Sequence, residues 1–421
     1  MLCAKPSAPR STRQPGSGFL ALCHDAPDGR PVQVICRRTP SHTNLTMHLQ
    51  GPAKLWLPPQ RSAAPSPGYL MIRSAEIENF RGFKSLRLAG FRRINIVVGD
   101  NSSGKTALLE GLFLASGASP QVAGKLRAWR GYNTELEGPP DQLMDAIWRD
   151  LFFDLSYDNT ASVRMVGTNG DTREMVITTA SHDQHQEIMP LKRPQDVLAI
   201  SHPLRFGWKG ANDDDFHWET PEIVGQQIKV TVRESNVRAY FISSAHPVAP
   251  KFLATMLSDL RKEGKDAPFQ QAMRKEFDYI KSISSEQNAG SAMLYAGLKG
   301  KTTLQPLNLM SSGIYKIANI LLHMMRAKKG FVCVDEIENG IYYTRLKSLW
   351  SAVERLSNQN QSQVFATTHS LECLQAAAKV LPARELSLIQ VFREKNGSCR
   401  ALLAEGENAI AAIESGIEVR S

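Results

Sequence analysis

The chain has 421 residues, of which 42% are hydrophobic and 22% charged, which is the balance of a soluble globular protein able to bury a sizeable core. No apolar run approaches the 18 or so residues that a membrane-spanning helix needs, and the apolar segment FLALC near the N-terminus is too short for a signal peptide. We therefore expect a cytoplasmic protein with no membrane partner. The six cysteines show no paired C-x-x-C spacing, so they indicate neither a zinc site nor a disulfide framework.

The formal net charge of +9 is concentrated in residues 1–70, which hold eight basic and two acidic side chains. The rest of the chain is nearly neutral, so bulk charge says little for a DNA partner. The same 70 residues contain 11 of the 23 prolines and no periodic apolar stretch of helix length, a composition that predicts disorder. Met71 then begins an alternating strand pattern. Our hypothesis is that the native protein starts at Met71 and that residues 1–70 are an upstream extension.

Residues 71–117 predict a strand, a turn at Arg81-Gly82, a second strand, a buried strand and a helix. The buried strand is Asn95–Val98, because a short apolar and β-branched run bounded by turn formers is typical of a central parallel strand. From Thr106 onward apolar residues recur at helical spacing.

The turn between this strand and this helix reads GDNSSGKT and matches the pattern G-x-x-x-x-G-K-[ST]. In that pattern backbone N–H groups and the positive end of the helix dipole face phosphate oxygens. Lys105 would reach the β- and γ-phosphates, and the Thr106 hydroxyl would ligate Mg²⁺. The predicted nucleotide-binding residues are Gly99, Asn101, Ser102, Ser103, Gly104, Lys105, Thr106 and Ala107.

Residues 118–300 show mixed patterns. A helix is expected near 141–153, and the alternating segments SVRMVGT, REMVITT and QQIKVTVRE predict an antiparallel β region. A polar stretch around HPLRFGWKGANDDDFHWE interrupts these segments. Residues 250–290 have a 3.6-residue apolar period and predict two or three helices.

After residue 305 apolar strands alternate with helices, which predicts a parallel sheet covered on both faces. Phe331–Val334 is one buried strand, and it ends in Asp335 and Glu336 at the sheet edge where ligands bind in such folds. Asp335 is predicted to hold Mg²⁺ through water, and Glu336 to act as general base on the attacking water. His369 follows the next strand at the same edge, where it could bond the γ-phosphate.

Four segments in order, GDNSSGKT, LMSSGIYK, FVCVDEIENGIYY and QVFATTHSLE, resemble the ABC-class ATPase heads of the SMC, RecF and OLD group. The resemblance covers residues 71–421 and implies an α/β P-loop NTPase fold with an ABC-ATPase-like head, that is, a mixed sheet covered by helices plus inserted β and helical subdomains. It implies ATP and Mg²⁺ as ligands and His369 as the switch histidine. It also implies that Ser311, Ser312 and Gly313 complete the nucleotide site of a partner subunit, while Glu338 and Asn339 fall in the D-loop.

The chain departs from the family pattern at two places. Ile314 follows the signature glycine, Gly313, where an acidic residue or glutamine is usual. The resemblance therefore implies nucleotide binding more strongly than it implies activation of a partner subunit's site. No Q-loop glutamine is evident, with Gln121 and Gln142 as weak candidates. Arg81 lies in a turn that is either near the nucleotide or simply at the surface.

The predicted domain organisation is an N-terminal extension (1–70), an N-terminal ATPase lobe (71–160), an inserted β and helical region (161–300) and a C-terminal ATPase lobe (301–421).

Lys105 and Asp335 are 230 residues apart, which favours the SMC/OLD side over a transporter subunit. No apolar heptad persists, so no SMC rod is expected, and no aspartate follows Asp335, so no fused OLD-type nuclease is expected.

The leading hypothesis is an ATP-hydrolysing molecular switch in which two copies close around ATP, in a DNA-linked process such as repair or phage defence, with DNA or a separate effector protein as a possible partner. One alternative is a nucleotide-binding module that docks a partner with little turnover. The other is a transporter ATPase subunit.

Overall fold

The structure is a computed structural model that describes residues 36–38, 45–48, 71–130, 135–138, 140–179, 203–224, 227–231, 233–288 and 290–416. Of residues 1–70 it describes only the short strands β1 (Cys36–Arg38) and β2 (Leu45–His48). The predictions of disorder in this segment and of a native start at Met71 therefore fall almost wholly outside the described residues.

A six-stranded central sheet organises the chain, with strand order β13-β17-β18-β5-β19-β20. Neighbouring strands are parallel from β13 to β19, and only β20 is antiparallel to its neighbour. The strands are β5 (Ile94–Val98), β13 (Ala239–Ile242), β17 (Phe331–Val334), β18 (Gln363–Thr367), β19 (Leu386–Arg393) and β20 (Cys399–Glu405). The sheet is thus assembled from segments far apart in the sequence.

The three middle strands are buried on both faces, as their continuous apolar runs predict. In β5, Ile94, Ile96 and Val98 join one hydrophobic cluster and Val97 joins another on the opposite face. Asn95 is the polar exception. Its side chain donates to the carbonyls of Arg92 and Val364 and accepts from the Ser387 hydroxyl, so burial leaves it satisfied and ties β5 to both neighbours.

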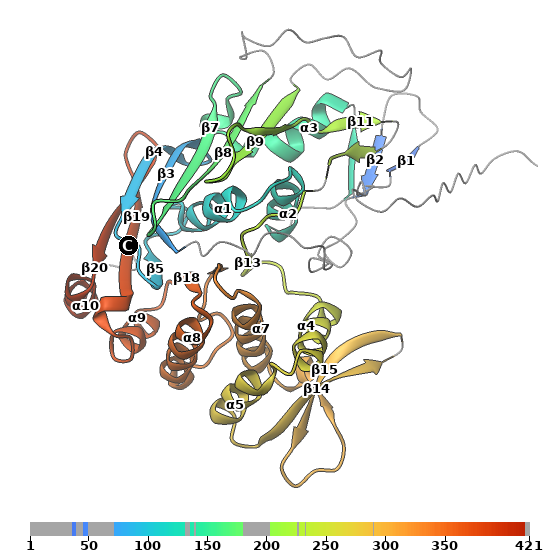
Figure 1. Cartoon of the computed structure of the whole chain (residues 1–421), viewed down its shortest axis with the longest axis vertical. Helices are drawn as coiled ribbons and strands as arrows, with labels where there is room; N and C mark the ends of the chain where they lie inside the picture. The colour runs from blue at the N-terminus through green and yellow to red at the C-terminus, as the bar shows by residue number, and fades with distance from the viewer. Residues whose placement is uncertain are drawn as a thin grey trace, which may run out of the picture.

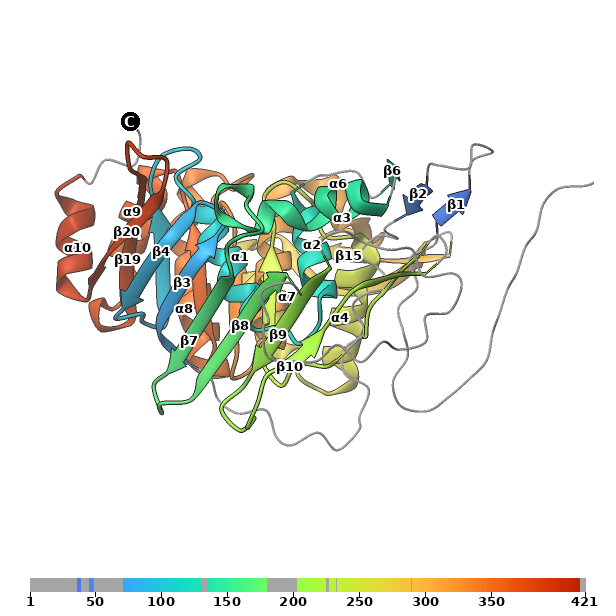
Figure 2. The same ribbon diagram turned by 90° about the horizontal axis from the view of Figure 1, so that it is seen from above.

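A second six-stranded sheet, antiparallel throughout, has the order β10-β9-β8-β7-β3-β4. Its strands are β3 (Ile72–Phe80), β4 (Phe83–Ala89), β7 (Ala161–Gly167), β8 (Thr172–Thr179), β9 (Leu204–Lys209) and β10 (His217–Glu219). Figure 2 shows them side by side as one layer. The side chain of Gln363 in β18 links the two sheets by pairing with both backbone groups of Ile72 in β3.

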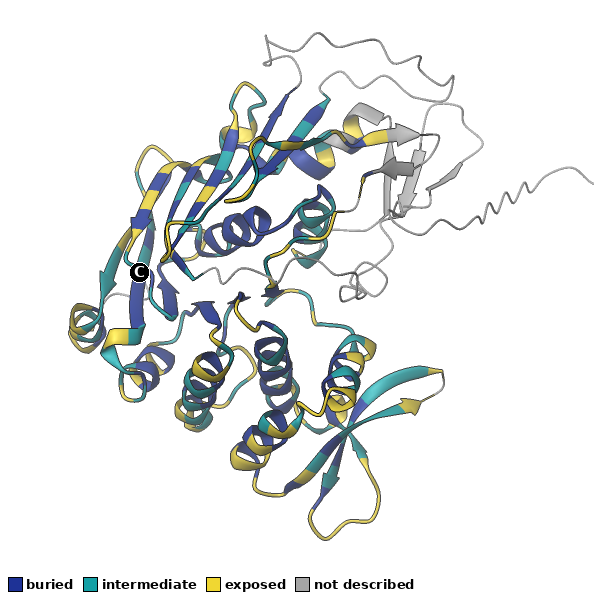
Figure 3. Ribbon diagram, viewed as in Figure 1, coloured by how far each residue is buried: buried dark blue, intermediate teal, exposed yellow. Residues whose placement is uncertain are grey.

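Helix α1 (Lys105–Ala115) lies between the two sheets, with α2 (Gln121–Trp129) beside it (Figure 1). Ten of its eleven residues are buried, and Figure 3 shows α1 dark along its length. A helix apolar on all sides is expected where both faces meet protein. α3 (Pro140–Trp148) follows, with the short 3₁₀ turns η1 (Arg149–Leu151) and η2 (Phe153–Leu155).

Further helices cover the other face of the central sheet and show exposed outer faces in Figure 3. They are α4 (Pro250–Lys262), α5 (Ala267–Glu276), α7 (Ser312–Arg326), α8 (Leu346–Asn360) and α9 (Leu371–Ala378). The short helix α6 (Leu307–Met310) precedes α7, η4 (Tyr343–Arg345) precedes α8, η5 (Ala383–Glu385) precedes β19, and α10 (Glu407–Glu414) follows β20. The predicted α/β class with a mixed sheet covered by helices is confirmed.

Three small sheets complete the described chain. The hairpin β14 (Ile280–Asn288) and β15 (Ser291–Leu298) pairs with β16 (Gln305–Pro306). β11 (Glu222–Val224) pairs with β12 (Gln227–Lys229). β6 (Glu135–Gly138) pairs with β2, which in turn pairs with β1.

The structure differs from the sequence predictions in three places. Residues 280–288 form strand β14 where a helix was expected. The stretch expected to be a polar interruption contains β9, because Leu204, Phe206 and Trp208 alternate onto the buried face. Finally, β3 pairs with β7, so the domain boundary predicted between residues 160 and 161 falls within one sheet.

Candidate functional site

The loop 99–106 connects β5 to α1 in a conformation that requires glycine at two positions. Gly99 has φ of 140°, and a Cβ there would lie 1.9 Å from the carbonyl oxygen of Val391. Gly104 has φ of 107° and lies against Cys399 and Phe83. Left-handed φ values and this close approach are what glycine permits and other residues resist. The loop therefore turns sharply, and the backbone of the loop lies over the N-terminus of α1.

Lys105 is buried at the start of α1, and its ammonium donates to the carbonyl oxygens of Gly99 at 2.7 Å and Asp100 at 2.6 Å. Burial lowers the pKa of Lys105, and the nearby carboxylates of Asp335, Asp100, Glu336 and Glu338 oppose that effect. The loop thus holds the Lys105 ammonium among acidic groups, of which Asp100 belongs to the loop and the others come from residues 335–338.

The carboxylate of Asp335, directly after β17, accepts hydrogen bonds from three hydroxyl groups. Thr106 Oγ1 donates at 3.0 Å and Thr367 Oγ1 at 2.8 Å to one oxygen, and Ser244 Oγ donates at 2.8 Å to the other. The Asp335 N–H donates to the carbonyl of Ile242 at the end of β13. Adjacent parallel strands end at the same edge, which is why residues 229 positions apart meet here.

Glu336 and His369 lie next to Asp335 at this edge. The Nε2 atom of His369 is 3.9 Å from Glu336 Oε1, and Asn339 donates to the other oxygen of Glu336 at 3.4 Å. Glu336 has φ of 46°, and its N–H donates to Thr367 Oγ1. A left-handed φ at a non-glycine residue is uncommon and tends to occur at functional sites. Glu338 accepts from the backbone N–H of His369 at 2.8 Å, which ties the segment after β17 to the segment after β18.

The opposite wall of the site carries a network of two arginines and two carboxylates. The buried Glu110 of α1 pairs with Arg81 at 2.9 Å and with Arg130 through two bonds of 2.7 Å. Arg81 also pairs with Asp150 at 2.9 Å. Its side chain is only 8% exposed, so the turn at Arg81-Gly82 is not a simple surface turn.

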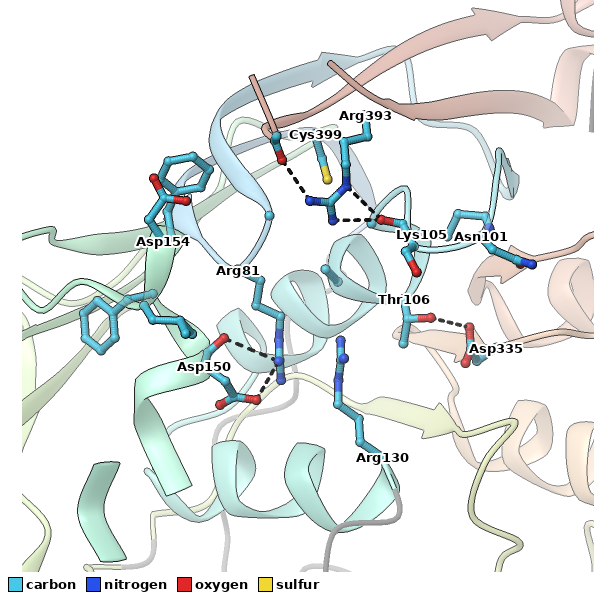
Figure 4. A pocket seen from close by; sticks show the side chains of 18 of the residues that line it. Arg81, Asn101, Lys105, Thr106, Arg130, Asp150, Asp154, Asp335, Arg393 and Cys399 are labelled. Carbon is cyan, nitrogen blue, oxygen red and sulfur yellow. Dashed lines mark hydrogen bonds and ion pairs between the residues drawn. The ribbon is translucent and has the colours of Figure 1, made fainter. Parts of the chain in front are cut away.

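Many of these side chains, among them Arg81, Arg130 and Asp150, line one large cavity of about 650 Å³ (Figure 4). Of the predicted site residues, those that line it are Asn101, Ser102, Gly104, Lys105, Thr106, Ala107, Asp335, Glu336 and His369. Gly99 and Ser103 belong to the same loop but do not line the cavity, and a Cβ on Gly99 would lie 3.0 Å from the Ser103 hydroxyl oxygen. Arg393, at the end of β19, supports the loop by donating to the Ser102 carbonyl at 2.9 Å.

The predicted signature residues do not reach this cavity in the described structure. Ser311 caps α7 by accepting from the Ile314 N–H, and Ser312 and Gly313 form the first turn of that helix. Gly313 packs so closely on residue 340 that a Cβ would lie 2.6 Å from the Gly340 carbonyl oxygen. Neither Gln121 nor Gln142 lines the cavity.

Sequence reasoning missed two contributors to the site. Ser244 follows β13, a four-residue strand that was not predicted, so nothing in the sequence marked its hydroxyl as a partner of Asp335. Arg130 follows α2, which was likewise not predicted.

The donor set fits a magnesium-bound polyphosphate. Thr106 and Asp335 present oxygen ligands of the kind that Mg²⁺ prefers. Among the described residues no group of three or more His, Cys, Asp or Glu side chains could hold a metal ion. Mg²⁺ is commonly held by one or two carboxylates together with substrate phosphate oxygens. The Ser103 hydroxyl, also in the loop, is buried with no hydrogen-bond partner in the described structure.

Comparison with known proteins gives one family match and several relatives. A family model described as "AAA domain, putative AbiEii toxin, Type IV TA system" matches residues 201–374, from β9 to α9. An "ATP/GTP phosphatase" of Helicobacter pylori is 24% identical over 346 residues, which cover 75% of this chain and 90% of that protein. A "DNA replication and repair protein RecF" of Oenococcus oeni is 39% identical over 47 residues, covering 11% of this chain and 13% of RecF.

Among solved structures, the chain is similar to an SMC head bound to the C-terminal winged-helix domain of ScpA. The identity is 14% and the TM-score 0.44, over 80% of this chain and 99% of the other. No helix in the described part of the chain is long and apolar enough to cross a membrane.

Proposed function

Because the chain is a P-loop ATPase of the SMC and RecF type, we propose that it binds and hydrolyses ATP in the large cavity and acts as a nucleotide-dependent switch. The observation that carries the proposal is the hydrogen bond between Thr106 and Asp335, which joins the phosphate-loop pattern to the acidic strand end. The relative named as an ATP/GTP phosphatase matches most of the chain and supports the same reaction.

Each side chain in the cavity has a role that follows from its chemistry. Lys105 contributes a positive charge to the β- and γ-phosphates, and the loop N–H groups bind their oxygens. Thr106 and Asp335 would hold Mg²⁺, which would supply positive charge to offset the negative charge that develops during phosphoryl transfer. Thr367 and Ser244 orient the Asp335 carboxylate from two sides through their hydroxyl hydrogen bonds.

Glu336 is placed to polarise the attacking water as general base. Asn339 and His369 lie on either side of its carboxylate, at 3.4 Å and 3.9 Å. His369 is half-exposed and can turn toward a γ-phosphate while its backbone N–H stays bonded to Glu338. A phosphate that contacts His369 would thereby favour one position of the segment that holds Glu338. This segment lies beside α7, the helix that begins at Ser312.

The switch requires a second copy of the chain. Ser312 and Gly313 lie at the exposed N-terminus of α7 and outside their own cavity. A helix N-terminus favours negative charge, so two copies placed head to tail would each offer this end to the other's ATP. Closure around ATP and reopening after hydrolysis would alter the affinity for a target. The short match to RecF supports a DNA-linked target, and a separate effector protein is the other candidate.

A phosphate-release assay with ATP and GTP tests the enzymatic half of this proposal. The wild-type chain should turn over with Mg²⁺ and lose turnover when Mg²⁺ is chelated. Lys105→Ala and Glu336→Gln should each lower the rate at least about 100-fold, because each removes a group used in the transition state. The exposed Lys84→Ala is the matched control. Equal rates for wild type and Lys105→Ala would favour the docking-module alternative, which predicts little turnover.

Light scattering tests the dimer. Glu336→Gln with ATP and Mg²⁺ should double in mass, since ATP binds but is not cleaved. Adding Ser312→Arg should keep the protein monomeric while ATP still binds, because the added side chain blocks only the partner's approach. Gln271→Arg, an exposed change on α5, should leave the dimer intact. A monomer at every nucleotide concentration would rule out the switch proposed here.

A further inference from the structure

A second, smaller cavity lies between α2, the edge strand β13 and helices α4 and α7, with a volume of about 60 Å³. We call it the aromatic cavity and define it by Phe113, Lys125, Trp129, Phe241, Phe252 and His323, which all line it. None of these residues lines the large cavity.

Stacked rings form its apolar wall. Trp129 and Phe241 lie parallel with ring centroids 5.1 Å apart and an interplanar angle of 8°. Phe113 packs on both, at 5.2 Å and 5.8 Å. Such ring pairs are rigid, so the wall is formed before any ligand arrives. It would remove an apolar group from water without ordering new side chains.

Lys125 brings a positive charge to this wall. It lies four residues before Trp129 in α2, so the two side chains share one face of the helix. No hydrogen bond or ion pair is formed by Lys125 within the described part of the chain, and burial lowers its pKa to about 8. His323 is buried, its Nδ1 pairs with the Asn319 carbonyl, and its pKa is lowered to about 4, so at neutral pH it adds no charge.

An ammonium without a partner among the described residues, set against an apolar wall, suits an anion with an apolar body. Phosphate is a poor match, because it needs several donors and gains nothing from aromatic rings. The volume admits roughly four to six water-sized groups, which is the size of a short alkyl carboxylate. We propose that the aromatic cavity binds a short-chain aliphatic carboxylate, with its anionic end on Lys125 and its alkyl chain against Trp129 and Phe241.

The aromatic cavity is also linked to the large one by two short connections. Ser243 donates to the carbonyl of Trp129 at 2.7 Å, and the next residue, Ser244, donates to Asp335 at 2.8 Å. On the other side, Arg130 follows Trp129, lines the large cavity and pairs with the buried Glu110 of α1. Both connections start at residues 129 and 130, so a ligand that holds Trp129 in its present position also stabilises both connections. If the large cavity binds ATP as proposed above, each ligand changes the affinity of the other by the same factor.

The binding test uses the full chain without nucleotide, so its outcome does not depend on ATPase activity. Saturation-transfer NMR would follow titrations with acetate, propionate, butyrate and octanoate. Affinity should rise about fourfold per methylene up to butyrate, the ratio that corresponds to burying one CH₂, and fall for octanoate, which exceeds the volume. Butylamine and inorganic phosphate should not bind. Butyrate binding no tighter than acetate binding, or equal binding of butylamine, would overturn the proposal.

Lys125→Met keeps the length of the side chain and removes its charge, so it should weaken butyrate at least tenfold. Lys125→Arg should restore most of the affinity, and Lys262→Met, at an exposed lysine of α4, should change nothing. Unchanged ATP affinity of Lys125→Met would show that the variant is folded. Equal butyrate affinity of wild type and Lys125→Met would show that the carboxylate binds elsewhere.

Coupling is measured as the ratio of ATP dissociation constants with and without saturating butyrate. The expected change is about fivefold or more, and Lys125→Met should reduce it toward one. A ratio of one in the wild-type chain would overturn the coupling and leave the binding result to stand by itself.

Discussion

Asp335 is the residue on which the large cavity depends, because three hydroxyl groups from three separate segments of the chain converge on its carboxylate. Two of these partners could be anticipated. Thr106 belongs to the phosphate-loop pattern, and Thr367 ends an apolar strand in the order expected of the fold. Ser244 could not be anticipated, because its position is set by pairing between β13 and β17, a contact that no local pattern records.

The Ser244 hydroxyl provides a prediction at this scale. Ser244→Ala removes one of the hydrogen bonds that orient the Asp335 carboxylate, and losing such an outer partner typically costs 10- to 100-fold in metal affinity. We expect the Mg²⁺ concentration for half-maximal ATP hydrolysis to rise by about tenfold, with partial recovery in Ser244→Thr. Ser348→Ala is the control, because the Ser348 hydroxyl donates to the carbonyl of Arg345 and not to Asp335. An unchanged Mg²⁺ dependence would show that Ser244 does not position Asp335.

His323 provides a second residue-scale prediction, on stability and pH. Its folded pKa of about 4 lies below its ordinary value of 6.5, because burial disfavours the charged ring. Between these values the unfolded chain binds more protons, so stability falls as pH falls from 6.5 to 4. The loss assigned to His323 is about 3 kcal/mol.

Urea unfolding at pH 7 and pH 4.5 checks this prediction. His323→Gln cannot titrate, so its free energy of unfolding should fall less over that interval than the wild-type value does. His217→Gln, at a half-exposed position, should follow the wild type. Parallel pH profiles for wild type and His323→Gln would contradict the assignment.

At the scale of elements, the strongest periodic segments were predicted and the weak ones were not. β5, β17 and β18 are continuous apolar runs, and α7 and α8 are long amphipathic helices, so each is dictated by local pattern. β13, with four residues, and β9, interrupted by Gly207, depend instead on neighbouring strands for their conformation. Residues 280–288 carry a mixed pattern that pairing with β15 resolves as a strand.

The contact between α7 and residue 340 provides a prediction at the element scale. Gly313→Ala would place a methyl group 2.6 Å from the Gly340 carbonyl oxygen, so α7 must shift away from the segment that holds Glu338. We expect a net destabilisation of about 1–3 kcal/mol, the usual cost of overpacking. The matched control is Gly124→Ala in α2, where a Cβ meets nothing within 4 Å. That change should stabilise by about 0.5–1 kcal/mol, because glycine is unfavourable inside a helix.

Urea unfolding of both variants separates the two effects, since each adds the same methyl group to a helix. Opposite signs are expected for Gly313→Ala and Gly124→Ala. If both variants were stabilised equally, α7 would not be held against residue 340 in solution.

At the scale of the whole molecule, the two sheets and the helix between them explain why the site forms. α1 is buried on both sides, so the loop before it is fixed by β5 and β19 and by the hairpin β3–β4 that carries Arg81. The sequence predicted the class of fold and the order of the nucleotide segments. It did not predict that β3 and β4 continue into β7, β8 and β9, because antiparallel pairing across 80 residues leaves no signal in either segment alone.

The same scale accounts for the separation of Ser312 and Gly313 from the large cavity. The loop 99–106 and the first turn of α7 lie in one chain. They would contact two different nucleotides if two copies close together. The arrangement requires first that the loop and the acidic pair Asp335 and Glu336 form one binding site.

Calorimetric titration of ATP with Mg²⁺ into Glu336→Gln tests that requirement most directly, because cleavage is blocked while every phosphate contact remains. We predict one nucleotide bound per chain, with binding lost when either Lys105→Ala or Asp335→Asn is added. Exposed Asp278→Asn should bind as before. Absence of nucleotide binding, or binding that survives both Lys105→Ala and Asp335→Asn, would contradict the account.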